Sequence, residues 1–363
     1  MFWIVFSLLV LLFTYLGQEE VNKKYYSFFR VLLVITLSYL IGFGGKPFTD
    51  HERYVFFYEY FDGIGDYNLS NLIGKSGRFE VGFLVLAKVG KLLGLGAPGF
   101  LFMVAAITNA FMVPVLYRFR YPLLSVLMFI TTAYYSQQAN AVRQMLAVAI
   151  ILWSLKYLQN KEIKRYLICV FVASLFHTGA ILLMIFALLG KIDQEENFNR
   201  IKTIILVSWV VSLVVAVGLL NFKMFGFSGI FEIYSDYSDE KSRFDNNFNP
   251  IYSAVLLYAL FDIKKNNIVY LIFLACGCVL LNMSLSPIAG KFFYRSAYYF
   301  TPLFCFFTGE LLYKNNHVKT KNLSTIPLVL ITSYYIFRLV LLYIFNPEIE
   351  FGTDLYPLSS FFA

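Results

Sequence analysis

The chain has 363 residues, of which 59% are hydrophobic and 14% are charged, and its mean hydropathy is +0.67. A soluble protein usually carries about 25% charged residues, so a water-soluble fold could not hide this much apolar surface, and the solvent must be lipid. The net charge of +8 predicts lysines and arginines in cytoplasmic loops. Because the sequence has no basic tail or RNP-like run, a nucleic-acid partner is not expected.

Ten apolar runs are candidates to cross a bilayer, for which about 20 residues are needed. The first run has no basic residue before it and is followed by Lys23 and Lys24, which predicts an uncleaved helix with its basic end in the cytoplasm. We expect a single membrane domain over residues 1–363, because no internal repeat separates the runs. The candidate spans are 1–17, 26–44, 99–117, 121–137, 139–157, 203–221, 249–263, 267–285, 293–312 and 325–345.

The positive-inside rule decides whether two further apolar stretches, 79–97 and 165–189, cross the membrane. If both crossed, the loops 118–120 and 156–165 would lie outside and would place six basic residues on the wrong face. If neither crosses, every strongly basic loop is cytoplasmic and the acidic or mixed loops are periplasmic. The rule therefore predicts about ten spans, within a range of about 10–12, plus two interfacial or re-entrant segments. The two sizeable periplasmic loops are then 46–78 and 223–247.

The residues of these two stretches agree with that topology. The first carries Lys88 and Lys91, which suit the membrane interface better than the lipid core. The second has His177 and Gly179 between two short apolar arms, which is the pattern of a re-entrant hairpin. One ordinary helix with a buried histidine is the alternative.

The cysteines and histidines do not form a metal-binding pattern. All four cysteines lie in apolar stretches, where they are typical core residues. The three histidines occur in no H-E-x-x-H motif, and the chain has no C-x-x-C motif. We therefore expect no disulfide, no metal site and no cofactor.

Several ionisable residues fall at membrane depth toward the outer face, where each buried charge costs roughly 2.5–3.5 kcal/mol or more. Three arginines among them predict a shared anionic ligand or paired carboxylates. Simpler alternatives stay open: Arg295 could extend to the outer headgroups, Arg338 could pair with Glu310 or with a carboxylate of the C-terminal tail, and His177 could be a packing residue. The residues at membrane depth are Glu80, Arg143, His177, Arg295 and Arg338.

Carboxylates and tyrosines are mixed in the first outer loop, and Asp62, Asp66 and Tyr67 belong to this set. Such side chains suit sugar hydroxyls and general-base catalysis. An ordinary solvated loop has the same composition, so that alternative is not excluded.

Three short patches together resemble the EpsG/Wzy-like family of bacterial surface-polysaccharide polymerases. They are Glu80-Val-Gly-Phe, Ala141-Val-Arg-Gln and Leu175-Phe-His-Thr-Gly-Ala, and the resemblance extends over residues 46–345. The family usually has a small hydroxyl residue two positions after its histidine, where this chain has Gly179.

The resemblance implies a GT-C-like glycosyltransferase of the bacterial inner membrane. Its activity would move a growing glycan from a polyprenyl diphosphate carrier onto the next lipid-linked repeat unit, and a chain-length regulator protein is a candidate partner. Arginine suits the diphosphate because guanidinium binds phosphate bidentately and stays charged. The candidate residues are Glu80, His177 and Asp66 for catalysis, Arg143, Arg295 and Arg338 for the diphosphate, and Asp62, Tyr67, Gln144 and Tyr298 for the glycan.

Three other functions compete with this interpretation. A lipid-linked oligosaccharide flippase would also bind a lipid diphosphate, but it should show internal repeats and a central cationic cavity. An O-antigen ligase would use related chemistry with another acceptor, and a membrane O-acyltransferase would move an acyl group. Glycan gels of a knockout strain distinguish all of them.

Overall fold

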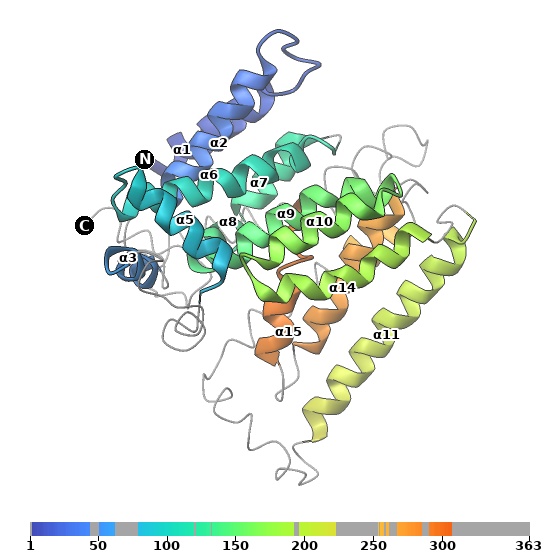
Figure 1. Cartoon of the computed structure of the whole chain (residues 1–363). Helices are drawn as coiled ribbons and strands as arrows, with labels where there is room; N and C mark the ends of the chain where they lie inside the picture. The colour runs from blue at the N-terminus through green and yellow to red at the C-terminus, as the bar shows by residue number, and fades with distance from the viewer. Residues whose placement is uncertain are drawn as a thin grey trace, which may run out of the picture.

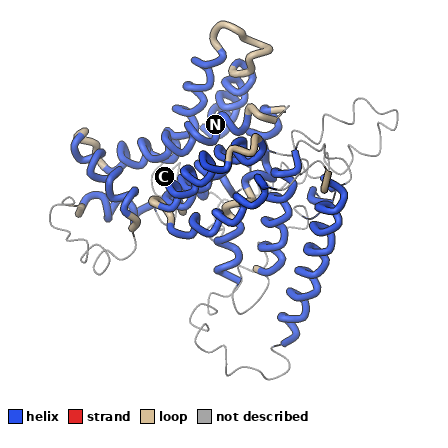
Figure 2. Tube along the Cα trace, turned by 45° about the vertical axis from the view of Figure 1, so that its right-hand side comes forward, coloured by secondary structure: helices blue, strands red, loops and turns tan. Residues whose placement is uncertain are grey.

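The computed structural model of the chain (Figure 1) describes a bundle of helices. No strand occurs in the part of the chain that is described, as the tube in Figure 2 shows. The predicted all-α class is therefore confirmed. The described residues are 2–43, 51–61, 79–119, 121–131, 133–191, 196–222, 253, 255–257, 259–260, 267–284 and 290–306.

The helices follow the predicted apolar runs, except that one helix begins at Val142, inside the predicted span 139–157, and another ends at Ala297, inside the predicted span 293–312. The stretch 165–189 is a helix–turn–helix. The candidate span 325–345 lies outside the described residues, as does most of 249–263. The helices are α1 (Phe2–Leu16), α2 (Tyr26–Phe43), α3 (His51–Glu59), α5 (Val81–Leu92), α6 (Ala97–Leu116), α7 (Pro122–Thr131), α8 (Ala133–Asn140), α9 (Val142–Gln159), α10 (Ile163–Ser174), the 3-10 helix η2 (Thr178–Lys191), α11 (Phe198–Phe222), α14 (Ile268–Met283) and α15 (Gly290–Ala297).

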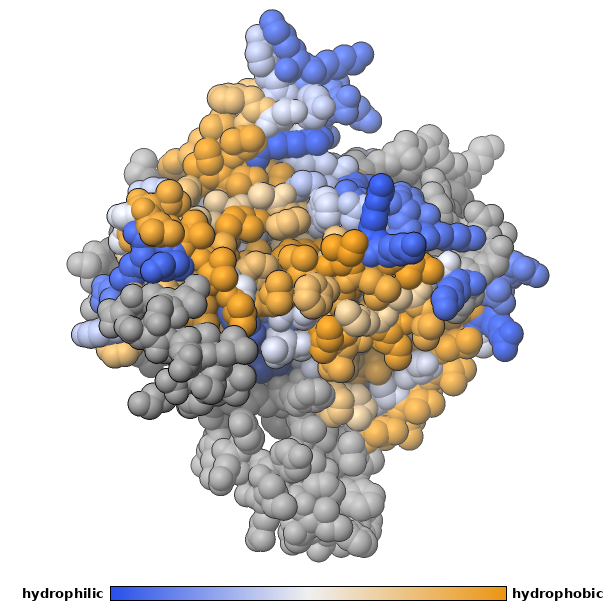
Figure 3. Space-filling view, viewed as in Figure 1, coloured by the Kyte–Doolittle hydropathy of each residue, from blue (hydrophilic) through white to orange (hydrophobic). Residues whose placement is uncertain are grey.

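Three of the described helices are long and apolar enough to cross a bilayer: Tyr26–Phe43, Ala97–Leu116 and Phe198–Val215. Only 17% of the last of these segments is buried within the protein, and Figure 3 shows a broad apolar surface that runs across the described helices. So much exposed apolar surface is stable in lipid and not in water. The chain is an all-helical membrane protein, and its ten-span topology stays a prediction.

A buried ladder of polar side chains joins α2, α6 and α8. Asn109 Nδ2 donates to Ser38 Oγ and to Gln138 Oε1, both at 3.1 Å, and Gln138 Nε2 donates back to Asn109 Oδ1 at 3.0 Å. All three residues are buried. In lipid, such interhelical hydrogen bonds hold helices together because apolar burial gives little preference for one partner. The ladder therefore fixes α8, which leads directly into the first turn of α9.

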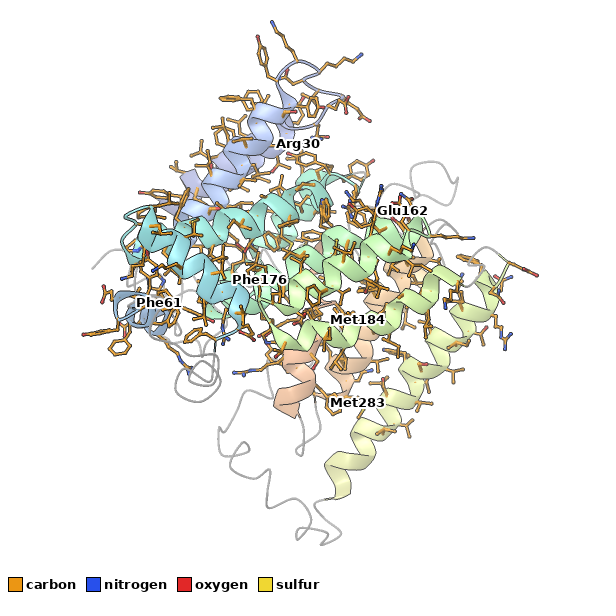
Figure 4. The ribbon with its side chains drawn as sticks, in the orientation of Figure 1. Arg30, Phe61, Glu162, Phe176, Met184 and Met283 are labelled. Carbon is orange, nitrogen blue, oxygen red and sulfur yellow. The ribbon has the colours of Figure 1, made fainter. Side chains whose placement is uncertain are left out.

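Basic side chains at one end of the bundle bind main-chain carbonyls of neighbouring segments. Arg30 Nε donates to Gly17 O at 2.8 Å, and its guanidinium lies over the Tyr117 ring at 4.0 Å. Arg118 Nη2 donates to Trp153 O at 2.8 Å. Figure 4 labels Arg30 and Glu162, which lie in its upper half, where the α1–α2 and α9–α10 connections are. The basic loops 18–25 and 156–165 thus share one end of the molecule.

Replacing Asn109 with Leu should lower the free energy of unfolding by about 1–3 kcal/mol, because Gln138 would lose its buried amide partner. Thermal unfolding of the purified protein in detergent measures this. Thr108→Val is the matched control: Thr108 is also buried, but its hydroxyl bonds only to Val104 O within its own helix. Equal losses from the two variants would contradict the role of the ladder.

Candidate functional site

The segment 163–191 is an antiparallel hairpin whose tip lies at residues 175–177. Tyr166 Oη donates to Leu183 O at 2.8 Å, and a methyl group built on Gly190 would lie 2.6 Å from the Ile163 side chain. The two arms therefore begin and end together. In Figure 4, Phe176 at the tip lies near the centre of the molecule, at the opposite end of α10 from Glu162.

The start of α5 is docked against this hairpin tip through its main chain. Gly82 N donates to Leu175 O at 2.8 Å, and Thr178 N donates to Glu80 Oε1 at 3.3 Å. A Cβ atom on Gly82 would lie 2.7 Å from Leu175 O and 3.0 Å from its carbonyl carbon. The Glu80-x-Gly82 spacing thus has a physical reason: the carboxylate accepts an N–H group of the tip, and the glycine lets the two backbones touch.

Arg143 lies in the first turn of α9 and forms an ion pair with Glu80. The two side chains are only 21% and 14% exposed, and the guanidinium lies 4.7 Å from the centre of the Phe79 ring. A partly buried pair is stable only if its partners have further polar contacts. Glu80 has one in the N–H group of Thr178. The sequence predicts separate roles for these two residues, whereas in the structure they form one ion pair.

His177 at the hairpin tip contacts Tyr299. Its Nδ1 atom lies 2.6 Å from Tyr299 Oη, and the two rings are 5.9 Å apart. Gly179 makes room for this contact, because a Cβ atom there would lie 3.1 Å from the imidazole ring. A serine or threonine at position 179 would therefore crowd the histidine.

The segment after α14 completes the cluster. Gln144 Nε2 donates to the main-chain oxygen of Arg295 at 2.6 Å, which joins α9 to α15. The Arg295 side chain is exposed and lies within electrostatic reach of His177, as do Glu80 and Arg143. Tyr298 is buried, with its ring 5.1 Å from that of Tyr294.

Half of the residues selected from the sequence come together here: Glu80, Arg143, Gln144, His177 and Arg295, with Tyr298 close along the chain. Asp62, Asp66, Tyr67 and Arg338 lie outside the described residues. The catalytic and binding roles assigned to all of them stay predictions. Within the described ranges, no group of three or more His, Cys, Asp or Glu side chains could hold a metal ion.

Two members of the cluster are not predicted from the sequence. The sequence predicts a role for Tyr298 and not for its neighbour Tyr299, because Tyr-Tyr-Phe at 298–300 does not show which ring faces the histidine. The aromatic support from Phe79 was also missed, although a ring directly before Glu80 was a usable signal.

Gly82→Ala should lower the free energy of unfolding by about 1–3 kcal/mol, because the added methyl group overlaps the Leu175 carbonyl and separates α5 from the hairpin tip. Gly96→Ala is the control, since its Cβ would be 3.9 Å from the nearest atom, in Pro98. Thermal unfolding in detergent checks both. If Gly82→Ala is as stable as Gly96→Ala, the close backbone contact does not exist.

The model of the EpsG family matches residues 27–351, which include every described residue of the cluster. No curated protein and no solved structure matches the chain.

Proposed function

This chain belongs to the EpsG family, and on that premise we propose that it is a membrane polysaccharide polymerase. It would transfer a growing glycan from a polyprenyl diphosphate carrier onto a lipid-linked repeat unit at the periplasmic face of the inner membrane. The observation that carries the proposal is that Glu80 of α5 contacts both Arg143 of α9 and the hairpin tip that carries His177, with Arg295 within electrostatic reach of the histidine. These side chains can bind a diphosphate and handle protons in a single place.

The arrangement of the helices supports the membrane orientation that this activity needs. The basic loops 18–25 and 156–165 share one end, which the positive-inside rule assigns to the cytoplasm. The hairpin 163–191 starts and ends at that end, so its tip and the cluster point toward the periplasm. Helix α5 packs near the start of α6, where a methyl group on Gly90 would lie 3.1 Å from Phe100. We propose about ten spans, with neither 79–97 nor 165–189 crossing.

The chemistry follows from the side chains of the cluster. The acceptor hydroxyl oxygen attacks the anomeric carbon of the donor, the bond from that carbon to the diphosphate oxygen breaks, and its electron pair stays on the diphosphate. Arg143 and Arg295, with Arg338 in support, would stabilise that charge. The proton of the acceptor hydroxyl goes to a carboxylate, for which Glu80, Asp62 and Asp66 are the candidates.

The Glu80–Arg143 pair suits this role because it holds the guanidinium in place before the lipid arrives. A preorganised donor stabilises developing charge better than one that must reorient during the reaction. Gln144 and Tyr298, with Asp62 and Tyr67, are proposed to line the path of the glycan. The proposed partners are the lipid-linked oligosaccharide and a regulator of chain length.

Arg143→Ala in the native host should abolish long glycan chains, a loss of at least ~100-fold in polymer, because the leaving group loses a charged donor. Glycan gels with matched expression levels measure this. Arg165→Ala is the control, since Arg165 also pairs with a glutamate, Glu162, but at the opposite end of the hairpin and with its side chain 67% exposed. Normal long chains from Arg143→Ala would end the proposal.

Single cysteines test the orientation. Lys161 and Glu59 are both exposed and are expected on the cytoplasmic and periplasmic faces. In a chain with its own cysteines replaced, a membrane-impermeant maleimide should label Glu59→Cys in intact cells and Lys161→Cys only after lysis. Labelling of Lys161→Cys in intact cells would place the basic loops outside and reverse the topology.

A further inference from the structure

The contact between His177 and Tyr299 restricts what the histidine can do. The distance of 2.6 Å between Nδ1 and Oη is that of a good hydrogen bond. Tyr299 is only 4% exposed, so its hydroxyl group cannot rely on water. The direction of this bond decides which ring nitrogen of His177 carries the hydrogen.

A buried hydroxyl hydrogen needs an acceptor, and His177 Nδ1 is the acceptor that the described residues bring to Tyr299 Oη. Tyr299 therefore donates, and Nδ1 accepts through its lone pair. A neutral imidazole has one N–H group, so the hydrogen of His177 lies on Nε2. In this tautomer the second nitrogen is a donor and has no lone pair to accept a proton.

The charges around the ring suit a donor. The guanidinium groups of Arg143 and Arg295 and the carboxylate of Glu80 act on His177, which gives an excess of positive charge. Net positive charge near the ring favours an N–H group that donates to an anionic oxygen, and bonds to charged groups are the stronger ones. The same surroundings do not help a base, whose protonation would add a further positive charge.

We propose that His177 donates a hydrogen bond through Nε2 to an anionic oxygen of the lipid diphosphate, and that Tyr299 is the positioning residue that fixes this tautomer. The inference rests on the proposed function. As the bond from the anomeric carbon breaks, the diphosphate oxygen takes its electron pair, and the Nε2–H group stabilises the charge while keeping its proton. The proton of the acceptor hydroxyl goes to a carboxylate and not to His177.

Two substitutions of the histidine distinguish a donor from a base. Glutamine can place its amide nitrogen close to the position of Nε2, whereas the shorter asparagine reaches only the position of Nδ1. His177→Gln should keep most of the glycan polymerisation, and His177→Asn should lose at least ~10-fold, as expected for a hydrogen bond to a charged group. Loss of polymerisation in both variants, with lipid binding unchanged, would mean that His177 is a base and would overturn the proposal.

A double substitution tests the positioning role of Tyr299. Tyr299→Phe should reduce polymerisation several-fold in the wild-type chain. In the His177→Gln background it should have little further effect, because glutamine leaves no atom at the Nδ1 position for the hydroxyl to orient. Such non-additivity is the signature of two residues acting through one contact. Equal losses in both backgrounds would make Tyr299 a packing residue only.

A lipid-binding measurement distinguishes failure of this inference from failure of the proposed function. The full chain in nanodiscs is titrated with undecaprenyl diphosphate and with undecaprenol, and thermal stabilisation is measured. Wild type and His177→Gln should prefer the diphosphate, and His177→Asn should show a preference reduced by ~10-fold or more. If the wild type shows no preference for the diphosphate, the proposed function fails. If the wild type prefers the diphosphate and His177→Asn shows the same preference, only the donor role of His177 fails. If His177→Gln does not accumulate, an unchanged preference in Tyr299→Phe overturns the inference.

Discussion

The cluster depends on where the carboxylate of Glu80 is held. One of its oxygens accepts the N–H group of Thr178 at the hairpin tip, and the other pairs with Arg143 at the start of α9. A single side chain therefore connects three segments that are far apart in the sequence. A buried and unpaired arginine is costly, and this pairing compensates the charge of Arg143 before any ligand binds.

The rest of the fold keeps those three segments in register. The ladder of Ser38, Asn109 and Gln138 fixes α8, whose last turn leads into α9 and its arginine. The main-chain bond from Gly82 to Leu175 fixes α5 against the hairpin tip. Polar contacts at helix interfaces are suited to this task in lipid, because apolar packing alone does not select one register.

Much of the fold could be predicted from local sequence. Apolar length located the helices, and the break at His177 together with the basic loop 156–165 predicted that the chain turns back there, as the Tyr166–Leu183 contact shows. The start of α9 at Val142, inside the predicted span 139–157, could not be predicted, because apolar length alone does not locate the residue at which a helix begins.

The sequence predicts several residues of the cluster but not the contacts between them. Charge at membrane depth is a local signal, so Glu80, Arg143 and Arg295 could be found from the sequence. Their pairing depends on how α5 docks on the hairpin, which is a long-range property. Which of the two tyrosines, Tyr298 or Tyr299, contacts His177 depends on the rotation of one short segment. A sequence of adjacent tyrosines carries no information about that rotation.

The closed shape of the segment 163–191 has a consequence for biogenesis. Both of its arms start and finish at the same end of the protein, so the segment cannot form as one continuous helix. Glu80 and Arg143 precede this hairpin in the chain, so the contact from Thr178 to Glu80 can form only after the hairpin has been synthesised and has folded against α5.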